Sequence, residues 1–215
     1  MNIDFPSSVL LQIDIQNDFC PNGALPIDDG DEVIEPLNKL ALLFTQNKGH
    51  VIATQDWHAA DHISFASAHP GKTPGELIDL PSVKDQVLWP DHCVQGTKSA
   101  DFHEKLNLSY ARMIIRKGVR QELDSYSAFF ENDRQTQTGL DGFLKCLNVK
   151  SVFLGGLAAD YCVFYSAMDA IRLGYKTYIL KDAVRGVGYP EGSIEKAFEE
   201  MINAGAEIID SSDLG

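Results

Sequence analysis

Three residues suited to covalent catalysis stand far apart in this chain. The first is Cys162, which follows the apolar run Val152–Leu154 and a turn at Gly155 and Gly156, where the pattern predicts that a helix begins. Free backbone N–H groups and the positive end of the helix dipole favour a thiolate at such a position, so Cys162 is a candidate nucleophile. The alternative is a buried cysteine that only fills the core.

Two charged residues are predicted to share the same edge of a sheet with this thiol. Asp14 lies near the carboxyl end of the apolar run Val9–Ile15, and Lys117 follows the run Arg112–Ile115. Both runs are typical of buried parallel strands, whose carboxyl ends form the rim where open α/β sheets bind ligands. A carboxylate can take the proton of Cys162, an ammonium can stabilise the anions, and the thiolate can attack a carbonyl carbon. Taken singly, Asp14 could cap a turn and Lys117 could be a solvated charge.

A second group of polar residues has the chemistry of metal ligands. Asp56 and His58 follow a predicted strand, 50–54, and alternate residues of an extended backbone point to one side. Carboxylate and imidazole groups bind Zn²⁺, Fe²⁺ or Mn²⁺, and one more imidazole would complete a site with open positions. The further histidines of the same long segment include His62, His69 and His92. Spacing does not select the third ligand, and the alternative is a set of loop histidines that face water.

Strands and helices alternate along the chain. The predicted strands are 9–15, 50–54, 112–115, 152–154, 175–180 and 206–209. The predicted helices run from an N-cap at Asp31 to about Gly49 and over 140–147, 160–173 and 191–203. This alternation predicts an α/β fold with three layers, in which a mostly parallel, six-stranded, doubly wound sheet carries helices on both faces. We expect one domain over residues 1–215, with a long insertion at about 55–110.

Composition narrows the class of partner and the cellular setting. The 215 residues carry a formal net charge of −13, which disfavours nucleic acid and anionic membranes and favours a small neutral or cationic ligand. Residues 1–8 lack the basic and apolar pattern of a signal peptide, and no long apolar segment follows. The four cysteines form no C-x-x-C pair, which argues against a disulfide framework and favours a reducing, cytoplasmic setting.

Six sequence blocks resemble, in order, those of the nicotinamidases, also called pyrazinamidases, within the isochorismatase-like hydrolases. The blocks are DIQNDF (14–19), TQDWH (54–58), WPDHCVQG (89–96), RKG (116–118), DSYSAF (124–129) and GLAADYCV (156–163). The first and last blocks are typical of the whole superfamily. The combination of Asp-x-His with Trp-Pro-x-His-Cys narrows the resemblance to the metal-containing nicotinamidases, and it extends over about residues 9–209.

The resemblance implies a role for each residue of the catalytic group. Asp14 would be the base, Lys117 its charged partner and Cys162 the nucleophile. The backbone N–H groups of Ala158 and Cys162 would form the oxyanion hole, next to a cis peptide at Leu157–Ala158. A non-proline cis bond costs about 3–4 kcal/mol, which is tolerated where it aims a catalytic group.

The resemblance also implies ligands for a metal and walls for a substrate ring. Asp56, His58 and His92 would hold one divalent ion, with zinc favoured over iron or manganese. Waters complete the shell in relatives, where a residue at the position of Ser64 can hold one, and a histidine near His62 is used in some members only. The proposed substrate contacts are Phe19 and Trp89, which match the residues that sandwich the ring, and Tyr126. Ala159 stands where many relatives carry threonine.

The predicted reaction is hydrolysis of nicotinamide, and also of pyrazinamide, through a thioester in NAD salvage. Either Asp14 or the metal could activate the water that releases the acid. Isochorismatases lack the cysteine, so Cys162 counts against that activity. N-carbamoyl amidases keep the cysteine but generally lack the metal block, so Asp56, His58 and His92 count against them. A nicotinamide-binding protein without activity is a further alternative. Relatives occur as monomers and as oligomers, so a homo-oligomer stays open.

Overall fold

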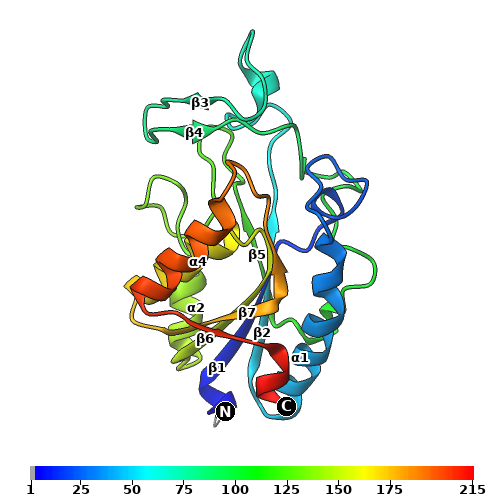
Figure 1. Ribbon diagram of the computed structural model, residues 1–215, viewed down its shortest axis with the longest axis vertical. Coiled ribbons are helices and arrows are strands. Elements are labelled where there is room, and N and C mark those ends of the chain that lie inside the picture. The colour runs from blue at the N-terminus through cyan, green and yellow to red at the C-terminus, as the bar shows by residue number, and fades with distance from the viewer. Residues whose placement is uncertain (1–2) are drawn as a thin grey trace.

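A six-stranded parallel sheet is the framework of the computed structural model, which describes residues 3–215 (Figure 1). Its strands are β1 (Ser8–Ile13), β2 (His50–Asp56), β5 (Met113–Lys117), β6 (Ser151–Leu157), β7 (Lys176–Arg185) and β8 (Glu207–Ile209). They lie in the order β5-β2-β1-β6-β7-β8, and each neighbouring pair is parallel. The chain builds outward from β1 on one side and from β6 on the other, so the switch point lies between β1 and β6.

Helices cover both faces of this sheet. Helix α1 (Ile34–Gln46) packs on one face, and α2 (Leu140–Cys146), α3 (Cys162–Arg172) and α4 (Ser193–Ala204) pack on the other (Figure 1). Side chains of β1 alternate between the two cores, because Leu10 packs in the cluster of α1 whereas Val9 and Leu11 pack in the cluster of α3. The predicted three-layer α/β fold is confirmed.

The segment between β2 and β5 contains a small second sheet that the sequence did not predict. Its strands, β3 (Leu77–Ile78) and β4 (Gln86–Val87), form an antiparallel pair beyond the carboxyl ends of the large sheet, at the end opposite to both termini (Figure 1). Isolated bridges join Phe65 to Trp89 and His58 to Val94 within the same segment. Two-residue strands are too short to show a period in sequence. The insertion at about 55–110 as a separate feature of the domain stays a prediction.

Several element boundaries differ from the predictions for local reasons. The turn Gly30–Val33 is a 3₁₀ helix and α1 has Val33 at its N-cap, so the prediction of Asp31 as the N-cap was wrong. Strand β6 continues through Gly155 and Gly156, where a strand end was predicted. Gly156 has a φ of 122°, and a Cβ there would stand 2.1 Å from the carbonyl oxygen of Ile13, so this glycine permits β1 and β6 to approach closely.

The described residues include no helix with the length and apolar character that crossing a membrane requires.

Candidate active site

Asp14, Lys117 and Cys162, called the triad below, meet at the switch point of the sheet. Asp14 directly follows β1, Lys117 is the last residue of β5, and Cys162 is the first residue of α3. The Lys117 Nζ atom lies 2.8 Å from Asp14 Oδ2 and 3.3 Å from Cys162 Sγ. Asp14 and Lys117 have no exposed surface and Cys162 has 6 %. The parallel strands therefore bring together three groups from distant parts of the sequence, as predicted.

The carboxylate of Asp14 is held in one orientation by Thr54 of β2. The Thr54 hydroxyl donates to Asp14 Oδ1 at 2.6 Å and accepts from the Asp14 backbone N–H at 3.1 Å. Asp14 has a φ of 49°, which turns the chain sharply at the end of β1. One carboxylate oxygen is thus fixed by Thr54 and the other faces Lys117. Thr54 was missing from the predicted site because only the register of β1 and β2 brings it to Asp14.

Protonation in the triad is set by burial and by the single cation. Burial raises the pKa of the Cys162 thiol well above its ordinary value, although the charge of Lys117 acts in the opposite direction. Burial therefore opposes the thiolate form that a helix start favours, which agrees with the expectation that a carboxylate takes the proton of Cys162. Burial also raises the pKa of Asp14, to about 6, against the lowering effect of Lys117. Cys162 consequently needs a base, and Asp14 has a pKa suited to that task.

Unpaired backbone donors lie beside the thiol. The Leu157–Ala158 peptide is cis, as predicted. The carbonyl of Ala158 accepts from the N–H groups of Tyr161 and Val163, and Ala159 N–H donates to the carbonyl of Arg185. Within residues 3–215, the N–H groups of Ala158 and Cys162 donate to no other backbone or side-chain group. These two donors are therefore free to bind an oxyanion.

Asp56, His58 and His92, called the ligand group below, offer side-chain donor atoms that all lie within 4.8 Å of one another and are buried. The His58 Nδ1–H donates to the carbonyl of Gly118 at 3.0 Å, and the His92 Nδ1–H donates to the carbonyl of Pro90 at 2.8 Å. Each ring therefore presents Nε2, as metal-binding histidines usually do when a carbonyl fixes the other nitrogen. His92, rather than His69, lies in this group, and Nε2 of His69 bonds the carbonyl of Ile63.

Gly118 is required by the packing of His58. Its φ is 61°, and a Cβ at this position would stand 2.3 Å from His58 Cε1. Only glycine permits the carbonyl that orients the His58 ring to approach so closely.

Burial and neighbouring charges give Asp56 and His92 the forms that bind a cation, whereas they favour the protonated form of His58. Burial would raise the pKa of Asp56, but Lys117 and His58 lower it below its ordinary range. Burial lowers the pKa of His92 to about 4, and the proximity of His58 adds to this effect. Burial opposes the charged form of His58, whereas Asp56 raises the pKa of His58 above its ordinary value. A carboxylate and a neutral imidazole are the forms that bind a metal ion.

His62 and Ser64 form a pair next to the ligand group. The Ser64 hydroxyl donates to His62 Nδ1 at 2.7 Å, and His62 Nε2–H donates to the carbonyl of Leu123 at 3.3 Å. The rings of His62 and His58 lie 4.3 Å apart. Donor atoms of His58, His62 and Asp124 also lie within 4.8 Å of one another, but both nitrogens of His62 already have partners in the protein.

Lys117 connects the triad to the ligand group. In addition to its ion pair with Asp14, its ammonium forms an ion pair with Asp56 and donates to the carbonyl of Ser125 at 3.0 Å. Burial alone would lower the pKa of Lys117, but Asp14 and Asp56 raise it well above its ordinary value. One buried ammonium therefore balances two buried carboxylates from different groups.

A narrow apolar pocket opens between the triad and the ligand group. Phe19, Trp89 and Tyr126 line it as predicted, and Trp89 Nε1–H donates to the Tyr126 hydroxyl at 3.0 Å. The structure adds residues that sequence reasoning missed, and these are Leu25, Asp124, Tyr161 and Val187. The Tyr161 ring meets Trp89 edge to face at 4.8 Å. The one feature of the sequence that pointed to Tyr161 was its position directly before Cys162. Val187 lies in the connection after β7 and carried no signal.

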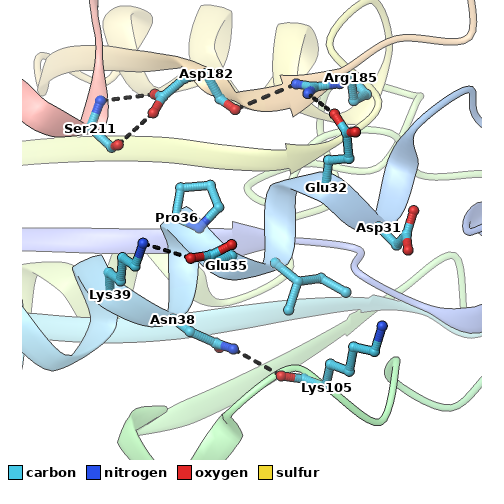
Figure 2. A pocket seen from close by; sticks show the side chains of 11 residues that line it. Asp31, Glu32, Glu35, Pro36, Asn38, Lys39, Lys105, Asp182, Arg185 and Ser211 are labelled. Atoms are coloured by element: carbon cyan, nitrogen blue, oxygen red, sulfur yellow. Dashed lines mark hydrogen bonds and ion pairs between the residues drawn. The ribbon is translucent and has the colours of Figure 1, made fainter.

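A larger open groove lies elsewhere, along α1 and the end of β7 (Figure 2). Its charged side chains are largely paired, since Arg185 bonds Glu32 at 2.7 Å and Lys39 bonds Glu35 at 2.7 Å. Among the described residues, no thiol or imidazole lines this groove. The chemistry of the molecule is therefore in the smaller pocket.

The fold and the site together define a cysteine amidohydrolase. Residues 8–213 match the isochorismatase domain. The nicotinamidase of Acinetobacter baylyi is 43 % identical and that of Escherichia coli 42 % identical, over 95 % and 97 % of this chain and 93 % and 97 % of those proteins. The chain belongs to the isochorismatase family and, within it, to the nicotinamidases.

Solved structures of nicotinamidases and pyrazinamidases are also similar to this chain. A nicotinamidase and pyrazinamidase of Acinetobacter baumanii is 46 % identical with a TM-score of 0.93, covering 98 % of this chain and 99 % of that one. The Pyrococcus horikoshii pyrazinamidase in complex with zinc is 35 % identical with a TM-score of 0.77, over 95 % and 99 % of the two chains. The yeast nicotinamidase bound to nicotinaldehyde is 30 % identical with a TM-score of 0.86, over 94 % and 99 %.

Proposed function

We propose that this protein hydrolyses nicotinamide to nicotinate and ammonia, with Cys162 as the nucleophile. The observation that carries the proposal is the buried contact of one ammonium, Lys117, with both a carboxylate and the thiol, at 2.8 Å and 3.3 Å. Cys162 lines a pocket with aromatic walls, where a flat ring can be held with its carboxamide towards the thiol. Pyrazinamide has a ring of similar shape and should react in the same way.

Acylation uses the triad and the two free N–H groups. Asp14 takes the proton of the Cys162 thiol, and the sulfur attacks the carboxamide carbon. The N–H groups of Ala158 and Cys162 receive the negative charge that develops on oxygen, where one such donor is typically worth about 2.7–4 kcal/mol. The carbon–nitrogen bond then breaks, Asp14 gives its proton to the departing ammonia, and nicotinate remains attached to Cys162 as a thioester.

Deacylation uses the same groups in reverse. A water molecule gives a proton to Asp14 as its oxygen attacks the thioester carbon, and the same two N–H groups bind the oxyanion. The carbon–sulfur bond breaks, and Cys162 recovers its proton from Asp14. Lys117 keeps its positive charge throughout, because two carboxylates hold its pKa high. It stabilises the thiolate and the ionised Asp14 in turn.

The ligand group fits one divalent metal ion, and we propose zinc. Two imidazoles present Nε2 because backbone carbonyls occupy their Nδ1 positions, and the carboxylate of Asp56 is ionised. Asp56, His58 and His92 would hold the ion, while the Ser64 hydroxyl is engaged by His62. When bound, the ion would supply a Lewis acid that fixes the ring nitrogen of the substrate. Phe19 and Trp89 orient the ring from either side.

The direct test is ammonia release from nicotinamide by the purified protein, followed with and without added zinc. Pyrazinamide, an N-carbamoyl amino acid and isochorismate serve as comparison substrates. The proposal expects turnover of the two ring carboxamides only. Turnover of the N-carbamoyl compound in preference to nicotinamide would contradict it. Activity on nicotinamide would place the protein in NAD salvage, and its four free cysteines suit a reducing, cytoplasmic setting.

A further inference from the structure

Asp160 is a buried carboxylate that the proposed reaction does not use. It lies two residues before Cys162 and is 7 % exposed. Its Oδ1 accepts from the backbone N–H of Val187 at 2.9 Å, and its Oδ2 accepts from the N–H of Gly188 at 2.9 Å and from the Ser193 hydroxyl at 2.6 Å. All three donors belong to residues 186–193, called the strap below, which comprise the connection from β7 to α4 and the first residue of α4.

The strap forms part of the wall of the catalytic pocket. Val187 lines the pocket together with Cys162 and Tyr161. The Tyr161 hydroxyl donates to the carbonyl of Tyr189 in the strap at 2.7 Å, and the Tyr189 hydroxyl donates to the carbonyl of Gly75 at 3.1 Å. The strap is thus hydrogen-bonded to Tyr161, next to the nucleophile. It is also hydrogen-bonded to the segment that leads into β3.

The strap also has little room for a larger side chain at its start, because Ile194 and Asp160 lie close to Gly186. A Cβ at Gly186 would stand 3.0 Å from Asp160 Oδ1 and 2.5 Å from Cγ1 of Ile194. The backbone therefore follows the carboxylate closely, and the position of Val187 depends on it. The pocket is narrow and Val187 stands in its wall, so a shift of the strap would change the space that a ring can occupy.

We infer that Asp160 is a positioning residue that fixes the strap, and that Val187, held by it, determines which ring substituents the pocket admits. The inference rests on the proposed function and extends it to the substrate class. A carboxylate suits the task because it accepts three hydrogen bonds at once, and hydrogen bonds to a charged group are stronger than those to a neutral one. A smaller residue at position 187 would widen the pocket beside Cys162 and should therefore admit methylated nicotinamides more readily.

The test compares Asp160→Asn, Val187→Ala and Tyr161→Phe with the wild type. The readouts are KM and kcat for nicotinamide and for a set of methyl-substituted nicotinamides. The matched control is Asp182→Asn, because the carboxylate of Asp182 likewise accepts from a backbone N–H and a hydroxyl, both of Ser211, but lies in the groove away from the pocket (Figure 2).

We expect Asp160→Asn to raise KM for nicotinamide about tenfold, because an amide nitrogen would face N–H donors. Val187→Ala should raise kcat/KM for methylated rings relative to nicotinamide, also about tenfold. Asp182→Asn should match the wild type in both. A fall in kcat that is equal for all amides, with an unchanged preference in Asp160→Asn and Val187→Ala, would overturn the inference. If Asp160→Asn does not fold, the preference of Val187→Ala and Tyr161→Phe between nicotinamide and methylated nicotinamides tests the inference instead.

Failure of the proposed function would look different. Nicotinate binding to the same variants can be measured by the quenching of aromatic fluorescence. This measurement tests the role of the strap without any turnover. A wild type that binds nicotinate but releases no ammonia would contradict the proposed reaction only, and weaker nicotinate binding in Asp160→Asn would still support the strap. A wild type that neither binds nicotinate nor releases ammonia would overturn both.

Discussion

The triad and the ligand group face one pocket, but the chain builds them in different ways. The triad comes from the ends of β1 and β5 and the start of α3, so regular elements fix its geometry. The ligand group takes only Asp56 from a strand, and the remaining members come from the irregular segment between β2 and β5. The backbone carbonyls of Gly118 and Pro90 orient the two imidazoles instead. Secondary structure can thus position the nucleophile, whereas specific loop contacts must position the ligands.

The largest effect should come from the residue that joins the two groups. Lys117→Met would leave Asp14 and Asp56 buried without their common cation, and breaking a buried pair in this way typically costs 3–5 kcal/mol. We expect loss of turnover together with a lower midpoint of urea unfolding. The control is Lys39→Met, because Lys39 pairs with Glu35 on the exposed surface of α1 and its loss should change neither. A Lys117→Met protein with normal stability and turnover would contradict the role of Lys117 as the common cation of the triad and the ligand group.

Metal removal should affect the ligand group but not the triad. Chelation should reduce turnover by more than about a hundredfold, because a Lewis acid typically contributes several kcal/mol, and zinc should restore it. Alkylation of Cys162 by iodoacetamide should continue at a similar rate in the metal-free protein, since the triad is fixed by the sheet. Full turnover without metal would contradict the role of the ligand group. Loss of Cys162 alkylation would show that the triad depends on the ion.

The two groups should also titrate at different pH values. Burial holds the pKa of Asp14 at about 6 and that of His92 at about 4. Asp14 acts as a base only when ionised, so kcat/KM measured at saturating zinc should fall about tenfold per pH unit below pH 6. Zinc binding should weaken as His58, whose pKa Asp56 raises above its ordinary value, becomes protonated, and equilibrium dialysis can follow this loss. A profile of kcat/KM that is flat down to pH 5 would exclude Asp14 as the base.

The raised pKa of Asp14 has a consequence for stability with a definite sign. Its folded value of about 6 lies above the ordinary value of about 3.9 expected in the unfolded chain. Between these values the folded protein binds more protons than the unfolded chain, so the contribution of Asp14 to stability falls as pH rises from about 4 to 6. Urea unfolding of wild type and Asp14→Asn across this range measures it. Equal pH dependence of the two proteins would contradict this assignment.

The smallest effect should come from a residue that supports the triad from behind. Thr54→Val keeps the shape of the side chain but removes the hydroxyl that fixes Asp14 Oδ1 at 2.6 Å. A hydrogen bond to a charged group contributes about 1.5–3 kcal/mol, so kcat should fall about tenfold or more while KM changes little. Thr54→Ser should restore most of the rate. A change in KM alone would indicate that Thr54 shapes the pocket rather than the base.

The same comparison explains how far sequence reasoning reached. Asp14, Lys117 and Cys162 could be placed on one rim because apolar runs identify parallel strands and strand ends meet at one edge. The pattern alone left three histidines as candidates for the third ligand, because only the folded chain shows that the carbonyl of Pro90 occupies Nδ1 of His92, whereas the carbonyl of Ile63 occupies Nε2 of His69. The assignment of His92 before the structure depended on the resemblance to nicotinamidases.

Other features needed the folded chain itself. Thr54, Val187 and Asp160 act through contacts across more than 25 residues of sequence, which no local pattern predicts. The effect of burial on the Cys162 thiol also needed the structure, because the sequence indicates a helix start but not how deeply it is buried. The strand pair β3–β4 was missed because two-residue strands have no period.

The central claim is covalent catalysis by Cys162, and one measurement tests it most directly. The protein is mixed with nicotinamide, quenched in acid within one turnover, and digested for mass spectrometry, with Cys162→Ala and Cys146→Ala treated in parallel. Cys146 is an exposed free thiol and serves as the matched control. We predict a nicotinoyl thioester on the peptide that contains Cys162 in wild type and Cys146→Ala, and neither adduct nor ammonia release in Cys162→Ala. Ammonia release by Cys162→Ala at the wild-type rate would contradict the mechanism.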